Sequence, residues 1–293
     1  MRTENHLKIS ALIPTYKRVD KLQKCIQEIL TCDPLPSEII IHIDAGDLET
    51  ESFLTTQKYP LVSWITSETT QGPGGGRNKL IKEAKFPLAA SFDDDSWPIS
   101  SDYFQIALDI FHNHPQIAVI SAQEIRRNSN DQLTKAINEN IREVACFQNC
   151  ACLLRREAFL QTRGYIPLRY AYGIEEAHVS LQLLDKGWKI IESLHLQIFH
   201  DTELEHHASP AINAAHIANT ALLAYLRYPS NYWSLGILQV LNRLRYAVIM
   251  GRWNGIIQGS IQIPKLLCQY RKQRFPVSSD TLTLSRRLSK QNG

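Results

Sequence analysis

Short apolar runs alternate with helical segments over the first 121 residues of the chain, and this alternation restricts the possible folds. Strands are predicted at residues 8–14, 39–43, 61–65, 87–92 and 117–121. Helices are predicted at 18–30, 77–85 and 102–112, where apolar residues recur at helical spacing. The pattern is typical of an α/β fold in which a mostly parallel sheet carries helices on both faces.

Polar residues follow three of these strands. They are the segment Pro14, Thr15, Tyr16, Lys17 and Arg18, then Asp44, then the run Asp93, Asp94 and Asp95. In open parallel sheets, ligands bind beyond the carboxyl ends of the strands. We therefore expect these three features to converge on one edge of the sheet.

The three consecutive aspartates are a candidate cation site. No Lys or Arg lies between residues 86 and 100 to neutralise them. Carboxylates at a strand end suit Mg²⁺ or Mn²⁺, with a substrate diphosphate completing the coordination. His200, which ends a later apolar run, is a candidate further ligand, and His206 and His207 lie nearby in the sequence. The alternative is a solvated acidic turn.

A glycine-rich stretch, GPGGGRN at residues 72–78, precedes the helix predicted from Arg77. Glycines let a backbone approach a ligand, and a following helix offers free N–H groups to an anion. The stretch lacks the Gly-Lys-Ser/Thr of a P-loop and does not fit G-x-G-x-x-G. A flexible turn is the alternative.

Two adjacent carboxylates, Glu175 and Glu176, open a helix predicted at 176–186. Acidic residues in a first turn favour the helix dipole, which is one explanation for them. The other is general-base catalysis, because a buried glutamate beside a second carboxylate has a raised pKa. Asp44 follows a strand, where a carboxylate is placed to accept hydrogen bonds from a nucleobase or ribose.

Together these pieces resemble the family 2 glycosyltransferases, which have a GT-A-type fold. The motifs that carry the resemblance are SALIPTYKR, Asp44, GPGGGRN, FDDD, NCACLLRREAF, RGY, YGIEEAHVSLQLLDKGWKI and IFH. They occur in the family's order over roughly residues 7–230. The order and spacing are more specific than any single motif.

The resemblance implies a metal-dependent, inverting transfer of a sugar from a UDP-, GDP- or dTDP-sugar to a hydroxyl of a glycan or lipid-linked acceptor. Glu176 would be the catalytic base, with Glu175 beside it, and Mn²⁺ or Mg²⁺ would be held by Asp95, Asp93 and His200. The donor would be bound by Pro14, Thr15, Tyr16, Arg18, Asp44, Gly75, Arg77, Asn78, Asp93 and Asp94. The chain departs from the family where Glu176 and His178 replace the usual aspartates.

A basic, amphipathic helical segment is predicted at 231–293, after a glycosyltransferase domain at 1–230. From Arg243 onward it has ten Lys and Arg and one Asp, a net charge of about +9. Basic amphipathic helices with Trp and Tyr suit a membrane interface, so residues 233–275 predict association with a membrane surface. The alternative is a helical appendage packed on the first domain.

Composition limits the other possibilities. A net charge of +3 gives no support for nucleic acid as a partner. The N-terminal residues lack the apolar core of a signal peptide, and no apolar run is long enough to span a membrane. Six cysteines without such a signal predict reduced thiols. These features predict a cytoplasmic protein, with a peripheral position at the inner face of the membrane if residues 233–275 bind lipid.

Two other functions are compatible with the motifs. The first is a nucleotidyltransferase that makes a sugar nucleotide, although such enzymes carry the glycine-rich loop after the first strand rather than the third. The second is a relative that binds sugar nucleotides without turnover, which the glutamate at the base position keeps open.

Overall fold

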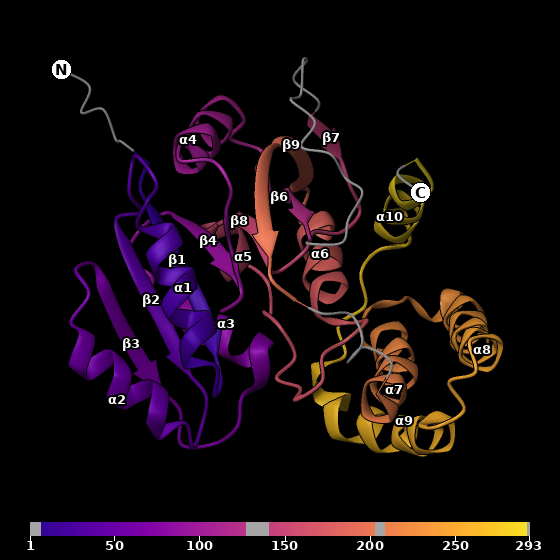
Figure 1. The fold of residues 1–293 in the computed structure, drawn as a ribbon. Helices are drawn as coiled ribbons and strands as arrows, with labels where there is room; N and C mark the ends of the chain where they lie inside the picture. The colour runs from indigo at the N-terminus through magenta and orange to yellow at the C-terminus, as the bar shows by residue number, and fades with distance from the viewer. Residues whose placement is uncertain (1–6, 127–140, 203–208, 292–293) are drawn as a thin grey trace.

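A mixed nine-stranded sheet forms the centre of the protein in the computed structural model, which describes residues 7–126, 141–202 and 209–291 (Figure 1). The strands are β1 (Ile9–Thr15), β2 (Glu38–Ile43), β3 (Val62–Thr66), β4 (Leu88–Phe92), β5 (Ser96–Pro98), β6 (Ile117–Ile125), β7 (Ile141–Glu143), β8 (Ala151–Arg155) and β9 (Lys189–His200). Their order is β3-β2-β1-β4-β8-β6-β9-β5, with β7 also paired to β9. Strands β5, β7 and β8 are antiparallel to their neighbours and the other six share one direction, so the predicted mostly parallel sheet is confirmed.

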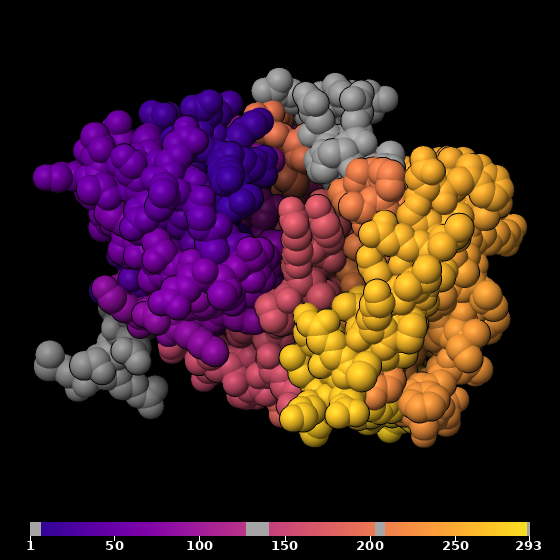
Figure 2. Space-filling model, turned by 90° about the horizontal axis from the view of Figure 1, so that it is seen from below, coloured from indigo at the N-terminus to yellow at the C-terminus, as the bar shows by residue number. Residues whose placement is uncertain are grey.

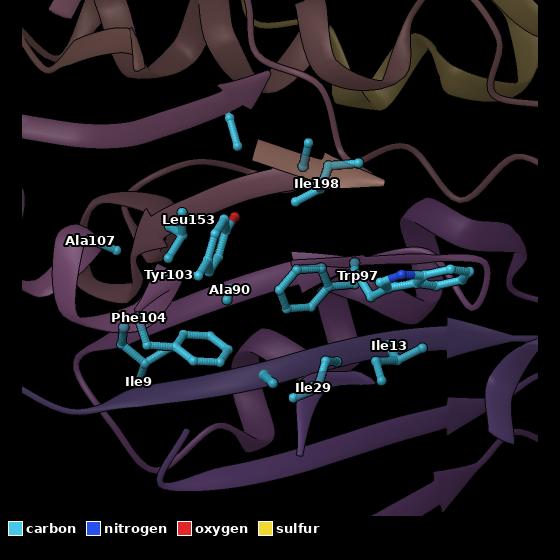
Figure 3. Close-up of a cluster of buried hydrophobic side chains, with 14 of the residues drawn as sticks. Ile9, Ile13, Ile29, Ala90, Trp97, Tyr103, Phe104, Ala107, Leu153 and Ile198 are labelled. Atoms are coloured by element: carbon cyan, nitrogen blue, oxygen red, sulfur yellow. The ribbon is translucent and has the colours of Figure 1, made fainter. Parts of the chain in front are cut away.

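Alternate side chains of the central strands enter two separate apolar clusters, one on each face of the sheet. Ile9, Ala11 and Ile13 of β1 pack with helix α1 (Val19–Ile29) in the first cluster. Leu12 packs in the second cluster, with helix α3 (Gly72–Glu83). Figure 3 shows part of the first cluster, with Ile13 and Trp97 toward the carboxyl end of β1. Helices therefore cover both faces, as the alternation in the sequence predicts.

Helix α3 begins at Gly72, five residues before the predicted start, so the prediction of a glycine turn before the helix is wrong. Gly72 has φ +66°, and Pro73 follows in the first helical turn, where a missing N–H costs nothing. A Cβ on Gly76 would lie 2.6 Å from His42 Nδ1, and one on Gly74 would lie 2.9 Å from Tyr165 Cβ. The glycines allow the first turns of the helix to pack closely against its neighbours.

Four other elements differ from the predictions. Helix α2 (Leu48–Gln57) was not predicted; the Asp47 side chain caps it by accepting from Thr50 N at 3.2 Å. Strand β6 continues four residues beyond the predicted end at Ser121, and β7 was not predicted. Strand β8, which consists of four apolar residues and Arg155, all buried, lies antiparallel between β4 and β6 and was not predicted.

The remaining helices follow the sheet or form the C-terminal part of the chain. They are α4 (Tyr103–Asn113), α5 (Arg156–Leu160), α6 (Glu175–Asp185), α7 (Pro210–Arg227), α8 (Trp233–Ile249), α9 (Ile256–Tyr270) and α10 (Ser279–Gln291). Helices α7, α8 and α9 lie together on the side of the molecule away from β3 and α2 (Figure 1), and they form one flank when the molecule is seen from below (Figure 2). Helix α10 returns to the sheet domain, where Leu288 joins the second apolar cluster.

Two further sequence expectations can be compared with the fold. The six cysteines, all within the described residues, form no disulfide. Across the described helices, none combines the length and the apolar character that crossing a bilayer requires.

Replacing the buried Leu22 of α1 tests the first apolar cluster. Leu22→Ala should lower the free energy of unfolding by about 2–5 kcal/mol, because the side chain is fully buried and leaves a cavity. Leu48→Ala is the matched control, since Leu48 is 76% exposed on α2 and its loss should cost no more than about 0.5 kcal/mol. Urea denaturation measures both, and equal losses would contradict the packing described above.

Candidate functional site

The three aspartates lie where the carboxyl ends of β1, β4 and β9 meet. Strand β1 pairs with β4, and β5, which follows the aspartates, pairs with the end of β9 so that Ser96 lies opposite His200. Ser96 fixes the turn, because its Oγ accepts from Asp93 N at 2.8 Å and donates to Cys150 O at 2.8 Å. A further bond, Asp201 N to Asp95 O at 2.8 Å, ties the turn to the residue after β9. Thr15 at the end of β1 donates to Asp94 and accepts from Asp44 N at 3.1 Å, so the predicted convergence of the three strand ends is present.

Each aspartate has a basic partner from a distant part of the sequence. Asp93 pairs with Arg77 of α3, and Asp94 pairs with Arg18 Nη1 at 2.8 Å. Asp95 pairs with Arg18 as well and with His200 Nε2 at 3.2 Å. Charge that looks unbalanced in the local sequence is thus balanced in the fold.

Asp94 is buried, as is Asp95, and it also accepts a hydrogen bond from Thr15 Oγ1 at 2.8 Å. Burial raises the pKa of its carboxyl to about 7, against the opposing effect of Arg18 and with a further increase from Asp95. For Asp95 the burial effect is outweighed by hydrogen bonds and charges from His200 and Arg18, so its pKa is lowered. The neighbouring carboxylates therefore differ in protonation, and Asp95 keeps the negative charge that a cation needs.

Asp93, Asp95 and His200 fit a divalent cation. Each offers one ligand atom, and these atoms lie within 4.8 Å of one another. His200 Nε2 is 3.2 Å from Asp95 Oδ1 and 3.9 Å from Asp93 Oδ2. Two carboxylates and an imidazole suit an ion such as Mn²⁺.

Glu124, at the end of β6, holds the other nitrogen of the His200 ring. His200 Nδ1 is hydrogen-bonded to its carboxylate. A carboxylate behind a histidine ligand fixes the orientation of the ring and raises its basicity. Burial alone would lower the pKa of His200, but hydrogen bonds to Asp95, Cys150 and Glu124 outweigh that effect and raise it to about 12, so His200 would have to release a proton on binding a cation. The sequence prediction missed Glu124 because it ended β6 at Ser121.

Arg77 connects the aspartates to the glutamates of α6. Its side chain is fully buried and donates from Nη2 to Asp93, from Nη1 to Glu175 Oε1 at 3.2 Å, and from Nε to Ser91 Oγ at 3.0 Å. Burial opposes its charge, but Asp93 and Glu175 more than compensate, so the pKa of Arg77 is raised above its ordinary value. The guanidinium is therefore a fixed positive charge between two carboxylates.

Glu175 and Glu176 are mostly buried where α6 begins. Burial raises the pKa of Glu175 to about 8, with Arg77 opposing and Glu176 and Asp93 adding to the increase. Burial also raises the pKa of Glu176, whose Oε1 lies 3.5 Å from the backbone nitrogen of Asn149. Carboxyl groups with raised pKa values suit proton transfer near neutral pH.

Asp44 and Asn78, both predicted to contact the donor, bond to the protein main chain. Asp44 accepts from Gln71 N at 2.8 Å and Gly72 N at 3.0 Å, at the start of α3. Asn78 donates to Tyr165 O and accepts from Tyr165 N, both at 2.8 Å. These bonds assemble the walls of the site, and direct contact of either residue with a nucleotide remains a prediction.

The other predicted residues have different environments. Gly75 is buried in α3 next to Gln71 and Pro167, whereas Tyr16 is exposed beyond the end of β1. Pro14 lies within β1, opposite His42. Their contact with a ligand also remains a prediction, and His206 and His207 lie outside the described residues.

Comparisons with known proteins identify a family and similar folds. The profile described as glycosyl transferase family 2 matches residues 10–172. No curated protein matches the chain.

Similar solved structures support the fold. The structure of S. aureus TarS residues 1–349 with UDP-GlcNAc is 16% identical, covers 98% of this chain and 89% of that chain, and has a TM-score of 0.63. The mannosyltransferase PcManGT from Pyrobaculum calidifontis, with GDP-Man and Mn²⁺, is 13% identical, covers 97% and 84%, and has a TM-score of 0.60. GalNAc-T7 with UDP, GalNAc and Mn²⁺ is 12% identical over 78% of this chain, with a TM-score of 0.59. This chain spans 49% of the GalNAc-T7 chain.

Replacing Arg77 tests its place between the carboxylates. Arg77→Met should lower the free energy of unfolding by about 3–5 kcal/mol, because Asp93 and Glu175 would lose their buried partner. Arg142→Met breaks the more exposed pair with Glu192 and should cost no more than about 1 kcal/mol. Both are measured by urea denaturation at neutral pH; an Arg77 variant as stable as the Arg142 variant would show that the buried pairing is not as described.

Proposed function

The chain belongs to glycosyl transferase family 2, and on that premise we propose that it moves a sugar from a nucleotide-diphosphate sugar to an acceptor hydroxyl with inversion at the anomeric carbon. One observation carries the proposal: Arg77 bonds both to Asp93 of the cation cluster and to Glu175, beside Glu176. The buried Arg77 side chain thus connects the proposed diphosphate site to the candidate base. This geometry suits acid–base group transfer at a sugar.

The donor is proposed to be a UDP-, GDP- or dTDP-sugar. The similar structures hold UDP-GlcNAc, GDP-Man, or UDP with GalNAc. In this chain, Asp44 and the residues from Pro14 to Arg18 lie at the strand ends, where nucleotides bind in open α/β sheets. We assign them to the nucleoside part of the donor, and Gly75, Arg77 and Asn78 to the wall beside the diphosphate.

The cation site is proposed to hold Mn²⁺ or Mg²⁺ through Asp95, Asp93 and His200. When bound there, the ion supplies positive charge for the leaving diphosphate. Glu124 orients His200 from behind, and the buried Asp94 supports the Pro14–Arg18 segment through Thr15. The protein thereby fixes the ligand atoms before a donor arrives, which lowers the cost of binding.

Glu176 is proposed as the general base. Its carboxylate takes the proton from the acceptor hydroxyl as that oxygen bonds to the anomeric carbon. The bond from that carbon to the phosphate oxygen breaks on the opposite face, and its electron pair leaves with the nucleoside diphosphate. Glu175 is a weaker candidate because it is held by the Arg77 guanidinium.

The acceptor is proposed to be a glycan or a lipid-linked molecule. A lipid-linked acceptor would place the enzyme at the inner face of a membrane, with residues 233–275 as the contacting segment. The composition of that segment supports the assignment, because it carries seven Lys and Arg and no acidic residue.

A donor panel tests the reaction class. With Mn²⁺ and UDP-, GDP- and dTDP-sugars, the protein should release nucleoside diphosphate from at least one donor. Asp95→Ala should abolish metal-dependent donor binding, measured by calorimetry, whereas Asp109→Ala, at an exposed site on α4, should not. Release of pyrophosphate would indicate a nucleotidyltransferase, and binding without turnover of any donor and acceptor would indicate a relative that has lost catalysis.

A pair of isosteric variants tests the base. Glu176→Gln should leave donor affinity unchanged and lower kcat by about 10²–10⁴-fold, because the amide cannot take the proton. Glu175→Gln keeps the proposed base and should retain more activity. A fully active Glu176 variant beside an inactive Glu175 variant would transfer the assignment to Glu175. NMR of the product formed by the unmodified protein should show that the anomeric configuration of the transferred sugar is inverted relative to the donor.

A further inference from the structure

Large apolar side chains are exposed along α8 and the first half of α9. Of the 19 exposed large apolar residues in the described parts of the chain, 11 lie between residues 233 and 261. They are Trp233, Ile237, Leu238, Leu241, Tyr246, Val248, Ile249, Met250, Trp253, Ile257 and Ile261. We call this set the α8–α9 face. Single exposed apolar residues are normal, but such a concentration indicates a binding surface.

The packing of α8 and α9 on α7 explains why this face is exposed. Gly236 of α8 meets Ala224, and a Cβ there would lie 2.5 Å from the alanine Cβ. Gly259 of α9 meets the backbone of Ala214, where a Cβ would lie 2.7 Å from the carbonyl oxygen. Small residues therefore occupy the packed side of both helices at these contacts. The large apolar residues are left on the outer side, which cannot contribute to the core.

The charge of the same segment has a single sign. Residues 233–275 contain seven Lys and Arg and no Asp or Glu. Arg245, Lys265, Arg271 and Lys272 are exposed. The exposed apolar residues thus lie in a segment whose charges are all positive. A matching partner needs an apolar interior and a negatively charged surface.

An anionic lipid bilayer meets both requirements. Basic helices with aromatic residues bury their apolar side at the boundary of headgroups and acyl chains, while Lys and Arg bind the anionic headgroups. A second copy of this chain fits poorly, because residues 233–275 carry positive charge only, so pairing the face with itself would bring like charges together. We infer that the α8–α9 face binds peripherally to the surface of a membrane that contains anionic lipid.

This face adjoins residues 168–172, the segment that leads to Glu175 and Glu176. Gln258 and Gln262, each one residue after Ile257 and Ile261, line a pocket together with Leu168, Arg169 and Tyr170. Asn219 Nδ2 of α7 donates hydrogen bonds to Tyr170 O and Tyr172 O, both at 2.9 Å. These tyrosines precede Glu175 by a few residues. A bilayer on the α8–α9 face would therefore lie beside the segment that leads into α6. Access of the site to a lipid-linked acceptor at this bilayer rests on the proposed function. Lipid binding by the α8–α9 face does not.

Co-sedimentation with vesicles tests the inference on the full chain. The protein should bind vesicles of phosphatidylcholine with phosphatidylglycerol, bind phosphatidylcholine alone more weakly, and lose anionic binding as salt rises from about 0.1 M to 1 M. Ile249→Ser with Ile257→Ser should weaken binding by at least about tenfold. Arg245→Gln with Lys265→Gln should weaken it by about 30-fold. Leu48→Ser is the control, since Leu48 is equally exposed on the far side of the molecule (Figure 1).

Three outcomes would overturn the inference. The first is absence of binding to anionic vesicles at low salt. The second is equal binding by the control and the face variants. The third is a stable dimer in sedimentation equilibrium that the face variants convert to monomer, which would make a second copy the occupant. Nucleotide-sugar turnover with a water-soluble acceptor, measured in parallel, separates the two proposals: turnover without vesicle binding contradicts the inference alone.

Discussion

The contact of the Arg77 guanidinium with Asp93 and Glu175 is the constraint on which the rest of the site depends. It joins the carboxyl end of β4 to the start of α6, residues that are 82 positions apart in the chain. Without the guanidinium between them, the partly buried carboxylates of Asp93 and Glu175 would repel each other. The glycines of α3 permit the arrangement, because they let the helix that carries Arg77 pack closely against His42 and Tyr165.

The same charge balance extends to the cation cluster. Arg18 and His200 compensate Asp94 and Asp95, and Glu124 compensates His200. The two arginines differ in access, because the Arg18 side chain is 43% exposed and that of Arg77 is 2% exposed. Arg77 is thus part of the framework, whereas Arg18 borders the solvent where a donor would enter. Glu124 adds a fixed orientation for His200, as carboxylates behind metal-binding histidines do.

Much of this was accessible from the sequence, for identifiable reasons. The buried strands are apolar runs, and the Asp93–Asp95 run directly follows one of them, so its position at a sheet edge could be predicted. The start of α3 could not, because glycines disfavour helices and only tertiary contact explains them. Glu124 was missed with the end of β6, where the adjacent polar residues Gln123 and Glu124 interrupt the apolar run. The pairing of the aspartates with Arg18 and Arg77 spans 16 to 77 residues and needs the fold.

The central claim is that the β4 aspartates, His200 and the α6 glutamates form one donor site held together by Arg77. Anomalous diffraction at the manganese edge, from crystals grown with Mn²⁺ and a nucleoside diphosphate, tests it most directly. The account predicts a peak bonded to Asp95 and His200, with the diphosphate between it and Glu176. A peak elsewhere on the protein, or a nucleotide bound away from the carboxyl ends of β1 and β4, would contradict it.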